Sequence, residues 1–275
     1  MGYFTNFEYA GEKLSDYKMM VCKFDSSGGL ETVSAGADVT FQQIRPGGSN
    51  RFLLYASTYE TALSAAFQIC KNPFFAEKQA EPFLSVEEVS ALQRWLCRKD
   101  RYHRFKINQE GFEHIYWNGT FSSRQIALNG QIIGLELTLY TDAPFAYMDE
   151  VSVEYHCTAD IPFDFYDNSD EITELNHPLF PDMEITLLTD GDFKLENSMD
   201  HKIMKLNHCK ANEIISIDGK NQIISSSLPS HDLANDFNYF FPRIINTYET
   251  RCNTFTPNLD CSIKIIYSPI RKIGL

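Results

Sequence analysis

Ser230, His231 and Asp232 are consecutive and have the three residue types of a hydrolase relay. A hydroxyl, an imidazole and a carboxylate act as nucleophile, base and orienting group only when each side chain is aimed at the next. Successive residues cannot take up that geometry, because their side chains leave the backbone in different directions. The triplet therefore does not predict a catalytic site.

Two other groups have residue types that bind metals. His201, His208 and Cys209 could ligate zinc, but the sequence shows no second well-spaced pair. The stretch FDFYDNSDE could supply oxygen ligands to calcium from four acidic residues, which are Asp164, Asp167, Asp170 and Glu171. Their spacing does not match an EF-hand loop, and no glycine lies at the centre. A solvated acidic loop is the preferred interpretation, and a metal site is the alternative.

One basic run stands out, and its members are Arg94, Arg98, Lys99, Arg101, His103, Arg104 and Lys106. Phosphate binding is one interpretation. A second is electrostatic, because cations near the carboxyl end of a helix interact favourably with its dipole. A third is a contact with an acidic surface of another subunit. In that case, reversing Arg98 and Arg101 to Glu should weaken oligomer formation, most strongly at low salt.

The sequence contains no nucleotide-binding glycine loop and no G-x-S-x-G element. Its seven cysteines lack paired C-x-x-C spacing, so we expect reduced thiols, with Cys70, Cys157 and Cys261 in strands. The N-terminal residues lack the basic and apolar regions of a secretion signal, and no apolar run reaches membrane-spanning length. We therefore expect a chain folded in a reducing cytoplasm, unglycosylated at Asn118, with no enzymatic activity, cofactor or membrane contact.

The elements that position these residues are mainly strands. Apolar residues alternate over Thr58 to Cys70, and again from Ile133 to Leu139, at the period of two typical of strands. The second half repeats the alternation from Val151 to Tyr155 and over Ser262 to Tyr267. Between them, Ile215 to Ile223 is typical of a hairpin in which Gly219 supplies the turn. We expect only strands in the second half.

One helix is predicted over SVEEVSALQRWLCRK, where Ser85 and Glu88 have the spacing of a capping box. Its apolar stripe should consist of Val86, Val89, Leu92 and Leu96, with Trp95 at the edge. The expected fold is therefore mainly β, with an N-terminal β sandwich or barrel carrying one packed helix, followed by a β sandwich.

Length and charge bound the class of protein. The 275 residues favour two domains, and Pro144 lies between a strand ending at Thr141 and one starting at Val151. The net charge is −13, divided as −4 over residues 1–150 and −9 over residues 151–275. An acidic surface argues against sequence-specific nucleic-acid binding and against binding to anionic membranes.

The order of several modest motifs resembles the distal tail protein family of long-tailed phages, including prophage copies. The first half contributes the Trp95–Leu96 helix end, then FEHIYWNGTFSS and GLELTLYTDAPFAY. The second half contributes LFPDMEI at 179–185, NEIISIDGKNQIISSS at 212–227, FNYFFPRI at 237–244 and the closing IKIIYSPIRKIGL. The resemblance covers nearly the full chain and rests on order and spacing.

The resemblance implies a structural hub at the tip of the virion tail, assembled in the cytoplasm of the host bacterium. Residues 1–145 would form the N-terminal ring-forming domain of a homohexamer, and residues 146–275 a galectin-like β sandwich. The implied partners are other copies of the chain, the tail tube protein, the tail-associated tip protein and, through the second domain, receptor-binding proteins. The alternative function is a soluble carbohydrate-binding, lectin-like module, which would need an aromatic platform.

Overall fold

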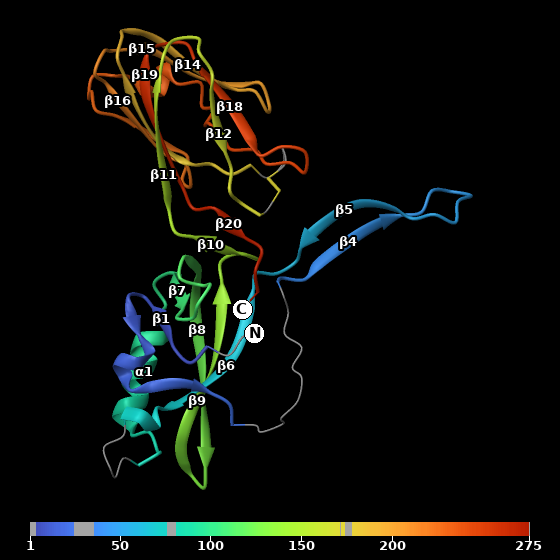
Figure 1. Cartoon of the computed structure of the whole chain (residues 1–275), viewed down its shortest axis with the longest axis vertical. Coiled ribbons are helices and arrows are strands. Elements are labelled where there is room, and N and C mark those ends of the chain that lie inside the picture. The colour runs from blue at the N-terminus through green and yellow to red at the C-terminus, as the bar shows by residue number, and fades with distance from the viewer. Residues whose placement is uncertain (1–3, 25–35, 76–80, 171, 174–177, 275) are drawn as a thin grey trace. The chain divides into compact units, whose positions relative to one another are not determined.

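The computed structural model describes residues 4–24, 36–75, 81–170, 172–173 and 178–274 (Figure 1). These residues fall into two compact units, the first comprising Met1–Met148 with Arg271–Leu275 and the second Asp149–Ile270. The division expected from the sequence, between residues 145 and 146, instead assigned residues 271–275 to the second domain. None of the helices in the described residues is long and apolar enough to cross a membrane.

The first unit is built on a large antiparallel sheet. Along its main path the strand order is β2-β1-β7-β8-β9-β6-β3. The bounds are β1 (Phe7–Tyr9), β2 (Glu12–Lys13), β3 (Met19–Cys22), β6 (Ser64–Lys71), β7 (His103–Ile107), β8 (Ile115–Leu128) and β9 (Gln131–Thr141). Short strands β10 (Ala146–Met148) and β20 (Ile270–Arg271) lie off this path, and two 3-10 turns cover Leu14–Tyr17 and Pro73–Phe75.

The alternation seen in the sequence sets the buried face of this sheet. In the β6–β9 pairing, Phe67 lies opposite Leu137 and Ile69 opposite Leu135, and all four side chains are buried. The strand expected over Thr58 to Cys70 is divided, since β5 (Leu53–Tyr59) ends before residue 60 and β6 begins at Ser64. The predicted inward face is nevertheless confirmed from Leu63 onward.

Helix α1 (Val86–Leu96) packs on this core. Its predicted capping box is confirmed: Ser85 Oγ accepts from the backbone N–H of Glu88, and the Glu88 carboxylate accepts from the N–H of Ser85. The predicted stripe is wrong at Val86, which is 76% exposed, whereas Trp95 is buried with Val89 and Leu92. Val86 is the first residue of the helix, and the buried stripe begins one turn later, at Val89.

The second unit is a sandwich of two antiparallel sheets in the described residues. One has the order β11-β19-β13-β16-β17 and the other β12-β18-β14-β15. The bounds are β11 (Val151–Cys157), β12 (Phe163–Tyr166), β13 (Asp182–Leu187), β14 (Gly191–Asn197), β15 (Lys202–Cys209), β16 (Ile214–Asp218), β17 (Ile223–Ser226), β18 (Cys252–Pro257) and β19 (Cys261–Tyr267). Inward residues of both sheets, such as Ile263 and Phe193, share one core. The prediction of a mainly β fold is confirmed.

Two local expectations in this unit need correction. The expectation of strands alone is wrong, because one helical turn, α2 (Leu233–Asp236), follows β17. The β16–β17 hairpin forms as predicted, but Gly219 does not have the positive φ of a turn glycine; that φ belongs to Gln222. A Cβ on Gly219 would lie 2.3 Å from the carbonyl oxygen of Pro181, so a close backbone approach requires glycine here.

Candidate assembly interface

A two-stranded hairpin in the first unit carries an exposed apolar surface. Among the residues that the structure describes, strands β4 (Val39–Ile44) and β5 (Leu53–Tyr59) pair only with each other, in antiparallel register from Val39 opposite Tyr59 to Ile44 opposite Leu53 (Figure 1). The register shifts between Gln42 and Gln43. We call the whole segment, residues 39–59, the hairpin arm.

The end of the hairpin arm is held by its own side chains. Arg45 donates from Nε to the carbonyl oxygen of Ser49 at 2.7 Å and from Nη2 to Asn50 Oδ1 at 2.8 Å. The same guanidinium lies 6.0 Å from the centre of the Phe52 ring, within the range of a cation–π contact. The arm therefore presents its apolar residues on an ordered ribbon.

Exposure of large apolar side chains is concentrated on this hairpin arm. Phe41 is 61% exposed and Tyr55 73%, and the full set is Val39, Phe41, Ile44, Phe52, Leu53, Leu54 and Tyr55. A lone two-stranded hairpin is at best marginally stable in water, because it buries little apolar area. A contiguous exposed apolar surface marks an interaction site. The hairpin arm is therefore the candidate interface of this unit.

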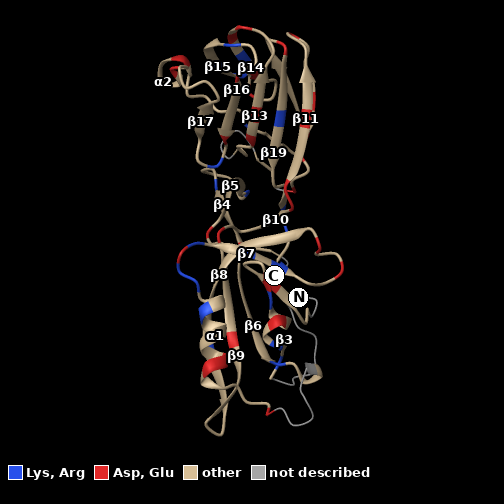
Figure 2. Cartoon of the chain, turned by 90° about the vertical axis from the view of Figure 1, so that its left-hand side faces the viewer, with Lys and Arg blue, Asp and Glu red and all other residues tan. Residues whose placement is uncertain are grey.

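The basic run divides between structural and exposed positions. Arg98 forms an ion pair with Glu12 at 3.1 Å and donates to the carbonyl oxygen of Trp95. The Arg104 guanidinium lies 3.9 Å from the centre of the Tyr116 ring. Lys99 and Arg101 are exposed in the loop between α1 and β7, where the blue segments gather (Figure 2). We call residues 99–101 the basic loop.

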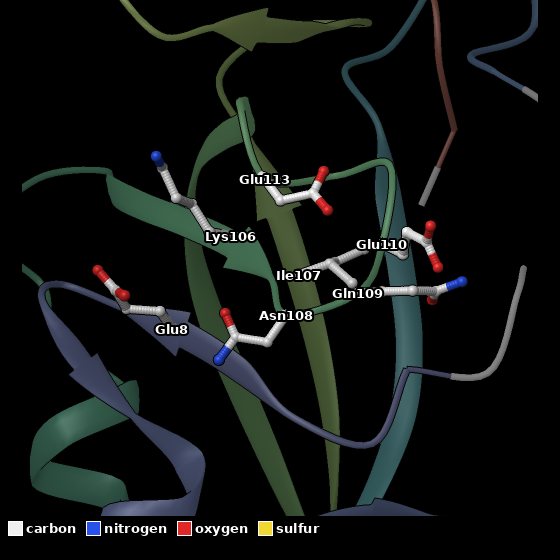
Figure 3. Close-up of a pocket in the computed structure, with 7 residues that line it drawn as sticks. All are labelled: Glu8, Lys106, Ile107, Asn108, Gln109, Glu110 and Glu113. Atoms are coloured by element: carbon white, nitrogen blue, oxygen red, sulfur yellow. The ribbon is translucent and has the colours of Figure 1, made fainter.

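An acidic pocket of about 460 Å³ lies at the opposite end of β7 (Figure 3). Its lining includes the carboxylates of Glu8, Glu110 and Glu113, together with Lys106. The backbone N–H groups of Glu113 and Gly111 hold the pKa of the Glu113 carboxyl below its usual value. A negatively charged surface thus faces solvent at one end of β7, and the basic loop lies at the other.

The acidic stretch of the second unit is built into the fold. Asp164 accepts a 2.7 Å hydrogen bond from Thr254 Oγ1. Asp167 is buried and accepts from the backbone N–H of Ser169 and from Asn246 Nδ2. Glu171 lies outside the described residues. Within the described part of the chain, no group of three or more acidic, histidine or cysteine side chains is arranged to hold a metal ion.

The serine–histidine–aspartate triplet does not form a relay. The His231 ring instead contacts Glu213 through Nδ1 and the carbonyl oxygen of Asn207 through Nε2. Ser226 donates its hydroxyl to the same Glu213 oxygen. A relay requires a serine hydroxyl on the imidazole, whereas here the His231 ring and the hydroxyl of Ser226, which lies outside the triplet, both bind the Glu213 carboxylate. The arrangement is a buried polar contact rather than a nucleophile.

The three residues considered as zinc ligands, His201, His208 and Cys209, each contact a different partner. His208 contacts Asp236 at 2.7 Å and His201 contacts Glu196 at 3.4 Å, while Cys209 donates to the carbonyl oxygen of Leu206.

The sequence did not predict the role of Glu213, because it is eighteen positions from His231 and no motif links the two. The hairpin arm was missed because its alternation is imperfect and apolar residues lie on both of its faces.

In the described residues, the candidate catalytic and metal-binding groups do not come together, and the first unit has an exposed apolar hairpin. Two family models match the chain, one described as a phage tail protein N-terminal domain over residues 3–143 and the other as a phage tail C-terminal domain over residues 145–267. The chain belongs to this family of phage tail proteins. It is thus a component of the phage tail, and its resemblance to that class of protein is confirmed.

A solved structure adds the fold of the whole chain. The crystal structure of SPP1 Dit (gp 19.1), a hub of the adsorption apparatus of phages that infect Gram-positive bacteria, matches with a TM-score of 0.66. The match covers 97% of this chain and 99% of SPP1 Dit, at 10% sequence identity. No curated protein sequence matches the chain.

Proposed function

We propose that the protein is the distal tail hub of a long-tailed phage or prophage, a structural component without catalytic activity. The observation that carries this proposal is the match to SPP1 Dit over almost the whole of both chains, combined with membership of a phage tail family. A shared two-unit architecture over that length supports a shared place in the tail, because a hub needs one part for the ring and another for the apparatus it carries.

The first unit is the proposed ring-forming domain and the second the domain that carries adsorption components. Ring formation needs a surface on which copies of one chain meet, and the hairpin arm offers one. A head-to-tail contact between copies closes a ring when the rotation allows it. The proposed ring is a homohexamer that continues the tail tube, and its further partners are the tube protein, the tip protein and receptor-binding proteins.

The charge distribution is compatible with this place in the tail. A channel that passes DNA should carry no net positive patch, because each Lys or Arg near a phosphate adds affinity and slows transit. The first unit carries no net charge, because residues 1–148 and 271–275 contain 16 Lys and Arg and 16 Asp and Glu. In the proposed ring the basic loop faces away from the channel.

The experiment is a measurement of mass in solution. Native mass spectrometry and light scattering on the purified full chain should show a species of six copies whose population rises with concentration. A monomer at every concentration would overturn the ring under those conditions. A monomer that also gives strong signals on a glycan array would favour the lectin-like alternative, since the tail hub requires assembly and no sugar.

A further inference from the structure

Two buried cysteines lie directly opposite each other in the second unit. Cys157 ends β11 and Cys261 begins β19, and the two are Cα partners in the antiparallel register. Opposed residues of antiparallel strands have Cα atoms about 4.5 or 5.5 Å apart. Both values fall within the range of about 4.4–6.8 Å that a disulfide spans. The backbone is therefore already positioned for a bond between the two sulfurs.

The side chains match this backbone geometry. The Cys157 and Cys261 side chains lie on the same face of the sheet, because the two residues are directly opposed in the register. The interaction between the two thiols lowers the pKa of Cys157 and, together with burial, raises that of Cys261. Cys157 retains 8% of its exposure, whereas Cys261 has none. Cys157 is thus the thiol that reacts first, because the thiolate is the nucleophile.

We propose that Cys157 and Cys261 form a disulfide when the folded protein passes from a reducing to an oxidising medium. The oxidant is a small disulfide of the glutathione class. The Cys157 thiolate attacks one sulfur of oxidised glutathione and releases one glutathione thiolate. Cys261 then loses its proton and attacks the Cys157 sulfur, which releases the second glutathione. Two protein thiols lose two electrons and two protons, and one glutathione disulfide becomes two thiols.

The position of this bond gives it a role. Nearly the whole second unit lies between the two cysteines, because β11 is its first strand and β19 one of its last. A link that closes so long a loop restricts the unfolded chain strongly. The proposed function explains why the two thiols would be oxidised only after folding, since a tail hub folds inside a cell and then works outside it. The thiol chemistry itself does not depend on that function.

A second thiol pair in the first unit shows why register matters. Cys22 lies opposite Gln68 and Cys70 opposite Met20, so these two cysteines are diagonal neighbours. Diagonal Cα atoms are about 7–8 Å apart, beyond the span of an unstrained disulfide. The interaction of the two thiols raises the pKa of Cys22 and lowers that of Cys70, but the strands would have to shift for a disulfide to form.

The test uses the purified full chain, first reduced and then incubated with oxidised glutathione. Alkylation followed by peptide mapping should identify an intramolecular Cys157–Cys261 link. The midpoint of thermal unfolding of the second unit should rise by roughly 10 °C or more relative to the reduced protein. Cys157→Ser and Cys261→Ser should each abolish the link and the rise, whereas Cys252→Ser on the neighbouring sheet should retain both.

Two results would overturn the proposal. One is full alkylation of Cys157 and Cys261 after oxidation of the wild-type protein, and the other is a link to some different cysteine. Because both measurements are made on the wild-type chain, a serine variant that fails to fold does not decide the matter. The copy number measured in solution tests the hub separately, so the two proposals can fail independently.

Discussion

The indole Nε1 of Trp95 donates a 3.0 Å hydrogen bond to the backbone carbonyl oxygen of Tyr9. This bond joins the last turn of α1 to β1, eighty-six positions away in sequence. The same indole stacks on the Tyr17 ring with centroids 4.4 Å apart and on the Phe7 ring at 5.9 Å. Trp95 therefore links the helix to the sheet through both a polar bond and packing.

We expect Trp95→Ala to destabilise the first unit by about 3–5 kcal/mol, because it removes a large buried side chain and leaves a cavity. Trp95→Phe should cost less, since it keeps most of the packing and loses the bond to Tyr9. Chemical denaturation of the first unit measures both. The matched control is Val86→Ala in the same helix, which should change stability by less than about 0.5 kcal/mol. Equal effects for Trp95→Ala and Val86→Ala would contradict this assignment.

Glu213 and His231 make a buried polar contact in the second unit. Burial alone would raise the pKa of the Glu213 carboxyl, but hydrogen bonds from Ser226 and His231 outweigh burial and lower it. A group with a lowered folded pKa stabilises the fold above its unfolded pKa and loses that contribution as pH falls through the folded pKa. Glu213→Gln should therefore destabilise the unit by about 1–3 kcal/mol at pH 7.

The pH dependence separates the charge of Glu213 from its shape. The difference between wild type and Glu213→Gln should shrink as pH falls from the ordinary carboxyl pKa of 4.5 through the lower pKa of the folded Glu213 carboxyl. Thermal unfolding between pH 3 and pH 7 measures it, with exposed Glu184→Gln on β13 as the control. A difference that stays constant across this range would mean that the ionised form of Glu213 contributes nothing.

The basic loop provides a test of the contact between copies. Arg98 is unsuitable because its reversal would also break the pair with Glu12. Lys99→Glu with Arg101→Glu should leave the monomer folded and weaken or slow ring formation, more at low salt because screening is least there. Native mass spectrometry across salt concentrations measures this. Assembly that is unchanged at every salt concentration would remove the basic loop from the interface.

A charge-swap variant identifies the surface that the basic loop meets. The acidic pocket carries Glu110 and Glu113 at the other end of β7 from the basic loop. If these two surfaces meet between copies, adding Glu110→Lys and Glu113→Lys to the variant with Lys99→Glu and Arg101→Glu should restore ring formation. The same pair in an otherwise wild-type chain should weaken assembly, which separates a specific contact from a change in net charge.

The sequence could predict the elements whose signals are local. The capping box at Ser85 and the alternation from Leu135 to Leu139 both depend on neighbours within a few positions, and both are confirmed. Val86 was placed wrongly because periodicity alone does not say where the buried stripe begins. Gly219 was predicted in the right turn for the wrong reason, since its constraint comes from Pro181, far away in sequence.

The interface surfaces could not be predicted, for a related reason. Alternation shows which residues share a face of a strand, but not whether another sheet covers that face. Leu137 and Leu54 are both leucines in strands, yet the first is fully buried and the second is exposed on the hairpin arm. Likewise, Cys157 and Cys261 become neighbours only through the β11–β19 pairing, which closes over most of the unit. Such pairings are non-local and leave no short motif.

The hairpin arm gives the sharpest test of the proposed ring. Replacing Phe41 and Leu54 with Ser and Gln removes exposed apolar surface, so the monomer should lose less than about 0.5 kcal/mol of stability. Ring formation should fall at least tenfold if these side chains are buried between copies, because burying each large apolar side chain contributes about 1.5–3 kcal/mol. Light scattering over a concentration series measures the change. The matched control is Leu128→Gln, a leucine that is similarly exposed in the β8–β9 hairpin of the same unit. If Leu128→Gln disrupts the ring and the arm variant does not, the interface lies on the β8–β9 hairpin and the assignment of the hairpin arm is wrong.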